Sequence, residues 1–166
     1  GPSSVRTFSG AALIVKTNAQ GGVSDVSVKT ESATYIVVTN GMSGASLREW
    51  IKLNERAVDV KAEVVQAGDK MGLMVKGPLK DVTPSLKAGG LGVAMTPEKK
   101  ISYVTFRTAD LRFDYVVDMK GMHEELIKEL PGLSGKLVDI DGRIVHSTRI
   151  ITAVRSIKAS KAKKGK

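Results

Sequence analysis

The chain has 166 residues, of which 42% are hydrophobic and 26% charged, and its formal net charge is +9 at pH 7. This composition is that of a globular protein, and no apolar run approaches the ~20 residues of a membrane-spanning helix, so we expect no membrane partner. Cysteine is absent, which excludes disulfides and thiolate metal sites and is consistent with an intracellular, reducing compartment.

The first half of the sequence combines short β patterns with one helical pattern. Residues 58–64 form the clearest strand, because apolar side chains alternate strictly with polar ones. The apolar residues of 47–51 share one helical face, and Ser46 precedes Glu49 by three residues, which is capping-box spacing. Gly77-Pro78 is expected to end the last strand. We expect the strands of this half at 12–17, 26–29, 35–38, 58–64 and 71–76.

The second half of the sequence repeats the same order of elements. Met122, Leu126, Ile127 and Leu130 recur at helical spacing. Pro131-Gly132 is expected to end this helix, because proline has no amide hydrogen with which to continue it. We expect the strands of this half at 91–95, 101–108, 111–117, 138–144 and 150–157.

The two halves also align residue by residue. Residues 10–30 align without a gap with residues 88–108, and residues 57–65 align with 137–145 at an offset that is two residues larger. Apolar positions coincide while the connecting residues differ, as expected for two copies of one backbone plan. The sequence therefore predicts an internal repeat of about 80 residues.

The order β-β-β-α-β-β, present twice, resembles the OB-fold, a five-stranded Greek-key barrel with a helix between its third and fourth strands. The predicted fold class is thus mainly β with one helix per repeat, arranged as two tandem OB-like barrels. The alternatives are a β-sandwich-like arrangement or one merged β-sheet domain. The expected boundaries are a first repeat at 5–78, a linker at 79–90, a second repeat at 91–157 and a disordered basic tail at 158–166.

The sequence offers little for catalysis. His123 and His146 are the only histidines, and neither has an oriented acid–base partner in the sequence. His123-Glu124-Glu125 is not the HExxH zinc pattern, and residues 132–136 lack the spacing of a phosphate-binding loop. We therefore expect no enzymatic activity, no metal site and no cofactor.

A candidate binding surface follows from strand alternation. If Val104 and Phe106 point into the second barrel, Tyr103 and Arg107 point outward, and Lys29 takes the place of Arg107 in the first repeat. An outward aromatic ring stacks on a base and cations neutralise phosphates. Tyr103 has an alternative role as an ordinary strand residue in contact with the helix or the other repeat. The remaining predicted nucleic-acid-binding residues are Lys16, Lys99, Lys100 and Arg112.

The other aromatic residues are expected in the cores. Phe113 and Tyr115 share the face opposite Arg112 and Asp114, Tyr35 aligns with Phe113, and Trp50 lies on the apolar stripe of the helix. The basic tail is expected to add affinity for polyanions without specificity. Its five lysines are Lys158, Lys161, Lys163, Lys164 and Lys166.

The OB resemblance implies non-catalytic binding of single-stranded nucleic acid, with DNA slightly favoured over RNA. The alternative is a structural or assembly protein, with a protein partner or a second copy held by the outer faces of the β units. That alternative predicts an exposed apolar patch or edge strand. Carbohydrate binding requires more exposed aromatic residues than a chain with 4% aromatic content offers.

Overall fold

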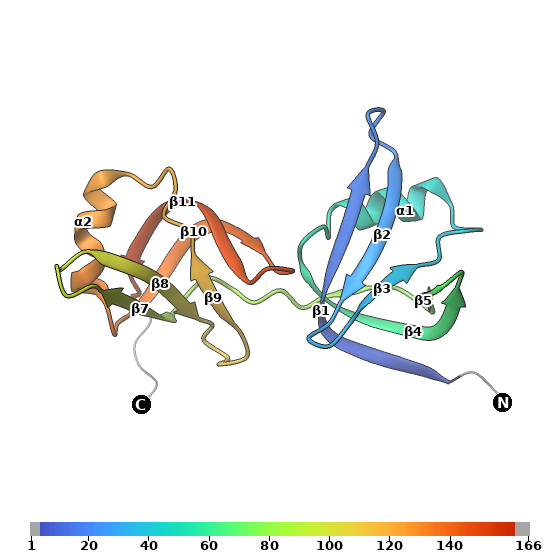
Figure 1. The fold of residues 1–166 in the computed structure, drawn as a ribbon, viewed down its shortest axis with the longest axis horizontal. Helices are drawn as coiled ribbons and strands as arrows, with labels where there is room; N and C mark the ends of the chain where they lie inside the picture. Colours follow the sequence, from blue (N-terminus) through green and yellow to red (C-terminus); the bar gives the residue numbers. More distant parts are fainter. Residues whose placement is uncertain (1–3, 162–166) are drawn as a thin grey trace. The chain divides into compact units, whose positions relative to one another are not determined.

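The computed structural model describes residues 4–161 and is mainly β (Figure 1). The chain divides between Thr83 and Pro84 into two compact units. Each unit contains a closed five-stranded barrel and one helix, so the predicted class of two tandem barrels is confirmed and a single merged sheet is ruled out. Among the described residues, no helix is long and apolar enough to span a membrane.

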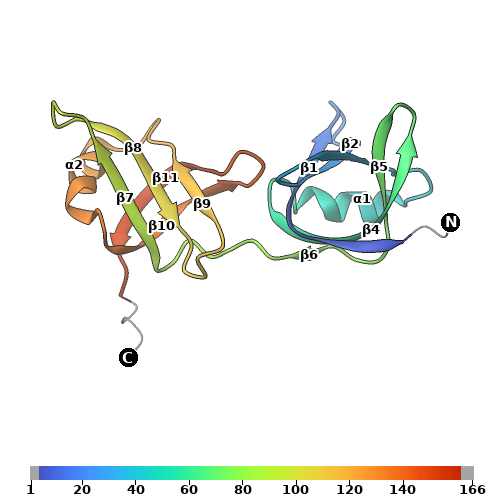
Figure 2. The same ribbon diagram turned by 60° about the horizontal axis from the view of Figure 1, so that its bottom comes forward.

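The first barrel closes because its first strand pairs with two others. Its elements are β1 (Val5–Thr17), β2 (Val23–Lys29), β3 (Thr34–Val37), α1 (Gly44–Ile51), β4 (Ala57–Ala67), β5 (Lys70–Val75) and β6 (Lys80–Asp81). The strand order is β1-β2-β3-β5-β4, with β4 returning to β1 and β6 added beside β4. The register of β1 with β4 shifts between Phe8 and Ala11, where Gly10 has a φ of +64°. This irregularity bends β1, whose two halves pair with β4 and β2 (Figure 2).

The second barrel repeats this plan. Its elements are β7 (Gly89–Met95), β8 (Ile101–Arg107), β9 (Asp114–Val117), α2 (Glu124–Leu133), β10 (Leu137–Val145) and β11 (Ile150–Ala159). The strands close in the order β10-β11-β9-β8-β7, with β10 pairing β7. In both barrels the third strand lies parallel to the fifth, which is β5 or β11, and all other pairs are antiparallel.

The two barrels share their register. Val15 lies opposite Val26, and Val93 lies opposite Val104 at the same relative positions. A side-chain hydrogen bond that anchors the first strand also recurs. The Gly10 amide donates to Asp59 Oδ1 at 2.9 Å, and in the second barrel the Ala88 amide donates to Asp139 Oδ1 at 2.9 Å. The predicted internal repeat is therefore confirmed.

The predicted alignment of Tyr35 with Phe113 is wrong. Tyr35 lies opposite Val28 on β2, and Val28 corresponds to Phe106 in the second barrel. The residue opposite Phe106 on β8 is Tyr115, so Tyr35 corresponds to Tyr115 and not to Phe113. The reason is that the loop between β8 and β9 has six residues, while the loop between β2 and β3 has four. The larger offset of the later strands therefore begins in this loop.

The start of α1 and the end of α2 differ from the prediction. Helix α1 is capped by Ser43, whose side chain accepts a hydrogen bond from the Ser46 amide at 3.1 Å, so Ser46 lies inside the first turn. Helix α2 is capped by His123 and continues through Pro131 to Leu133. A proline in the last turn removes one intrahelical hydrogen bond, and here that loss does not end the helix.

The fifth strand is interrupted in the first barrel only. Gly77, with a φ of +92°, and Pro78 separate β5 from β6, whereas the corresponding β11 is continuous. The segment 79–90 contains β6 and the first two residues of β7. Strand β11 includes Lys158 and Ala159, the first residues of the predicted tail, and residues 162–166 lie outside the described part of the chain.

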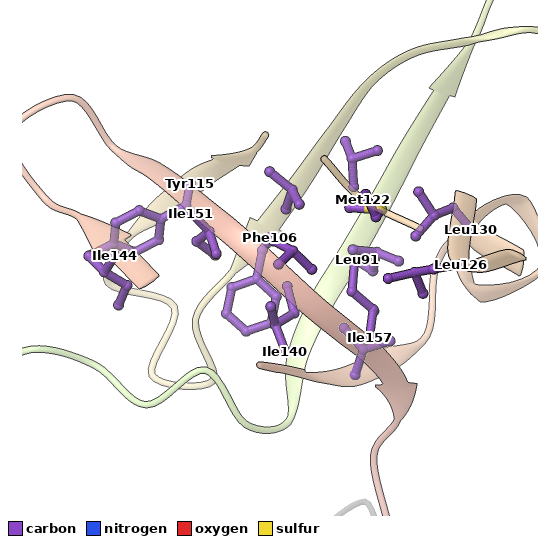
Figure 3. Close-up of a cluster of buried hydrophobic side chains, with 14 residues drawn as sticks. Leu91, Phe106, Tyr115, Met122, Leu126, Leu130, Ile140, Ile144, Ile151 and Ile157 are labelled. Carbon is purple, nitrogen blue, oxygen red and sulfur yellow. The ribbon is translucent and has the colours of Figure 1, made fainter. Parts of the chain in front are cut away.

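Each barrel has its own core. In the first, Trp50 of α1 packs with inward residues of β1, β2 and β4, as its helical stripe predicted. In the second, Leu126 and Leu130 of α2 close one end of a cluster that contains Phe106 and Tyr115 (Figure 3). The predicted core role of Tyr115 is confirmed, since it is 1% exposed.

The start of β7 offers a test of this packing. A Cβ at Gly89 would lie 2.1 Å from Phe106 Cζ and 2.6 Å from the Arg107 carbonyl oxygen, whereas a Cβ at Gly90 would meet nothing within 4 Å. We expect Gly89→Ala to lower the free energy of unfolding by about 1–3 kcal/mol through overpacking. Gly90→Ala should change it by less than about 0.5 kcal/mol. Urea unfolding of both variants measures the difference, and equal stabilities would contradict the observed packing.

Candidate nucleic-acid interface

The outer face of β7, β8 and β9 carries the candidate site. Val104 and Phe106 are fully buried, and strand alternation therefore turns Tyr103, Thr105 and Arg107 outward. Tyr103 is 54% exposed, which places its ring on the surface as the alternation predicted.

Small residues lie beside this outward row. On β7, Gly90, Gly92 and Ala94 are the cross-strand neighbours of Arg107, Thr105 and Tyr103. A Cβ at Gly90 would meet nothing within 4 Å, so the backbone of β7 is uncovered beside Arg107, whereas a Cβ at Gly92 would lie only 2.7 Å from the Thr105 hydroxyl oxygen. The sequence signal for this opening is Gly90, whose place beside Arg107 follows only when β7 is paired with β8.

Arg107 is not an isolated cation. Its Nε and Nη2 donate to the two carboxylate oxygens of Asp114 on β9, at 2.8 Å and 3.0 Å. These hydrogen bonds raise the pKa of Arg107 and lower the pKa of Asp114. Both side chains are more than half exposed, so the pair contributes little to stability. The Asp114 carboxylate does offset the positive charge of Arg107, which strand alternation had placed on this face.

Cations lie at both ends of the outward row. Lys99 and Lys100 are exposed in the turn that leads into β8, four and three residues before Tyr103. Arg112 is exposed in the loop between β8 and β9, beyond Arg107, and its guanidinium carbon lies 5.1 Å from the Phe113 ring centroid. The structure therefore brings these predicted residues to one barrel.

The sequence missed Arg149, in the turn between β10 and β11. Its guanidinium carbon also lies 5.1 Å from the Phe113 ring centroid, and its Nη1 donates to the His146 carbonyl. No sequence signal indicated this role, because Phe113 and Arg149 meet only through the parallel pairing of β9 with β11. A second guanidinium thus lies beside the same ring as Arg112.

A buried aromatic cluster supports this corner. His146 is fully buried, and its Nδ1 lies 2.7 Å from the Tyr115 hydroxyl. The Phe113 ring packs edge-on against His146, with 4.8 Å between centroids. His146 is buried against these rings and supports the loop that presents Arg112 and the turn that presents Arg149.

The remaining predicted residues, Lys16 and Lys29, lie on the first barrel. Lys29 is exposed at the position of Arg107, and its neighbour on β3 is Thr34 in place of an acid. Lys16 is exposed opposite Asp25, which occupies the position of Tyr103. The first barrel therefore has an acid and no aromatic ring at the position of Tyr103.

The second half of the sequence also carries a larger net positive charge than the first half. Residues 84–166 contain 16 lysines and arginines against 9 acids, whereas residues 1–83 contain 10 against 8. Within residues 4–161, no cluster of three or more histidines and acids is arranged to hold a metal ion. The face can offer ring stacking, backbone contact and positive charge.

The buried tyrosine–histidine pair generates a prediction. Tyr115→Phe keeps the ring and removes the hydroxyl beside His146 Nδ1. We expect the free energy of unfolding to fall by about 1–3 kcal/mol, because the buried nitrogen loses this hydrogen bond. Tyr103→Phe, which removes an exposed hydroxyl, is the control and should change it by less than about 0.5 kcal/mol. Urea unfolding measures both values, and an unchanged stability of Tyr115→Phe would show that the pair contributes nothing.

No protein-family model, no curated protein and no solved structure matches the chain. The OB-like description of both units accordingly rests on strand order, register and the helix between the third and fourth strands. What the protein does is inferred from the outer face of the second barrel and from its surroundings.

Proposed function

We propose that the protein binds single-stranded nucleic acid without catalysing a reaction, with DNA favoured slightly over RNA. The outer face of β8 in the second barrel is the main contact. The observation that carries this proposal is the exposed ring of Tyr103, which lies in one outward row with Arg107 on β8.

The row has the dimensions of a short stretch of single strand. Tyr103 and Arg107 are four residues apart on one strand, which corresponds to roughly 13 Å at ~3.3 Å per residue. A base stacked on the Tyr103 ring contributes about 1–3 kcal/mol and does so with little regard to sequence, because every base has a π face. The uncovered backbone at Gly90 leaves space for a sugar or a base edge beside Arg107.

The cations at the two ends of the row attract the phosphates. Lys99 and Lys100 lie at the Tyr103 end, and Arg112 and Arg149 lie at the other end. Each phosphate neutralised releases counterions, which makes such binding salt-dependent. Lys16 and Lys29 on the first barrel add positive charge but no ring, so the first barrel contributes less affinity than the second.

A second candidate function is protein assembly through the first barrel. Three exposed apolar side chains, Val5, Ile36 and Met74, lie on the outside of neighbouring strands of that barrel, and Val5 and Met74 flank Glu63 from both sides. A hollow of about 510 Å³ lies beside α1 and is lined by Trp50 and Pro78 among others. Sedimentation of the protein at rising concentration tests for self-association through these surfaces.

The stacking role of Tyr103 is tested by Tyr103→Ala. We expect this variant to bind oligothymidylate more weakly by about 1–3 kcal/mol, because one stacking platform is lost. Its melting temperature should stay unchanged, because the ring is exposed. Asp25→Ala, at the same position of the first barrel, is the matched control and should not weaken binding. Parent-like affinity of Tyr103→Ala for both oligothymidylate and oligouridylate would contradict the proposal.

The ion pair on the same face generates a further prediction. Asp114→Asn removes the carboxylate that offsets the Arg107 charge, so we expect tighter binding of oligothymidylate. If Arg107 then neutralises one more phosphate, the slope of log K against log salt concentration steepens by about 0.7. Asp81→Asn breaks the Arg56–Asp81 pair of the first barrel, whose atoms lie 3.1 Å apart, and is the control. Weaker binding by Asp114→Asn would show that Asp114 itself contacts the ligand.

A further inference from the structure

The loop between β8 and β9, residues 108–113, differs most clearly from its counterpart in the first barrel. It is two residues longer than the loop at 30–33. It presents Leu111, whose side chain is 72% exposed and whose backbone φ is +62°. A leucine in the left-handed region is unfavourable compared with glycine or asparagine, and residues in such conformations gather at functional sites.

A network of hydrogen bonds holds Leu111 in this position. The buried Thr108 donates its hydroxyl to Asp110 Oδ1 at 2.6 Å, and the same oxygen accepts from the Arg112 amide at 2.9 Å. The Phe113 amide donates to Thr108 Oγ1 at 3.1 Å, and the Leu111 amide donates to the Thr108 carbonyl at 2.8 Å. The loop is therefore a fixed structure that displays an aliphatic side chain.

Two guanidinium groups lie against the Phe113 ring of the same loop. Arg112 follows Leu111 in the chain, and Arg149 reaches the same Phe113 ring from the turn between β10 and β11. The loop leads directly into Asp114, the partner of Arg107, so Leu111 lies at one end of the proposed single-strand face. The shorter loop of the first barrel has Glu31 and Ser32 at its centre, and its one apolar residue is Ala33, with only a methyl side chain.

An exposed aliphatic side chain on a fixed loop, with two guanidinium groups held on a ring of that loop, is suited to packing against a base pair. Proteins insert leucine and similar side chains against base steps, while arginines hold the neighbouring phosphates. We propose that the second barrel binds the junction at which a single strand leaves a duplex. Leu111 packs on the terminal base pair, Arg112 and Arg149 contact the phosphates at the junction, and the single strand continues over Arg107 and Tyr103. This inference rests on the proposed function.

The test compares the affinities of three probes for the full chain: an oligothymidylate, a blunt duplex, and the same duplex with a single-stranded thymidylate tail at its 3′ or 5′ end. We expect one of the tailed duplexes to bind about tenfold more tightly than either simple probe, from one added stacking contact. Leu111→Gly should abolish this preference and leave the affinity for oligothymidylate unchanged. Glycine adopts the required φ without strain, so this variant should fold at least as stably as the parent.

Ser32→Gly, in the shorter loop, is the matched control and should keep the preference. Equal affinity of the parent for the tailed duplexes and for oligothymidylate would overturn the inference, as would a preference that survives in Leu111→Gly. In both cases binding of oligothymidylate would leave the proposed function intact. Failure of the parent to bind oligothymidylate would overturn the proposed function, and the inference with it.

Discussion

Closure of the barrel is the constraint on which the rest of this structure depends. In each unit the first strand must pair with the second strand on one side and with the fourth on the other. Asp59 and Asp139 hold that first strand through the same hydrogen bond in both units, at Gly10 within β1 and at Ala88 just before β7. Once the ring is closed, every strand has one face in the core and one on the surface.

This constraint explains how two copies of one backbone plan can carry very different side chains on their outer surfaces. Inward positions must fill a small barrel, so they remain apolar and of limited size, as Val26 and Val104 illustrate. Outward positions carry no such requirement. Asp25 in the first barrel and Tyr103 in the second occupy equivalent places on the surface, and the two faces therefore have different chemistry on one backbone.

The differences between the copies also gather at the connections. Two additional residues in the loop between β8 and β9 provide Leu111 and its neighbours, while Gly77-Pro78 interrupts the fifth strand of the first barrel alone. A loop of a closed barrel can be lengthened while the strands keep their places in the barrel, so the sequence numbers of the cross-strand partners shift by the added residues. These connections are therefore the places where the second barrel acquired the corner formed by Arg112, Phe113 and Arg149.

The sequence by itself determined the order of strands and helices along the chain, the internal repeat, and the outward direction of Tyr103 and Arg107. The first two follow from local patterns and from the alignment of the two halves, and the last follows from a local period of two residues. Only the tertiary structure decided that Arg107 pairs with Asp114, that Arg149 joins Arg112, and that His146 is buried. The physical reason is that cross-strand partners depend on loop length and on how the ring closes. A loop two residues longer moved the partner of Phe106 from Phe113 to Tyr115, and no local pattern records such a shift.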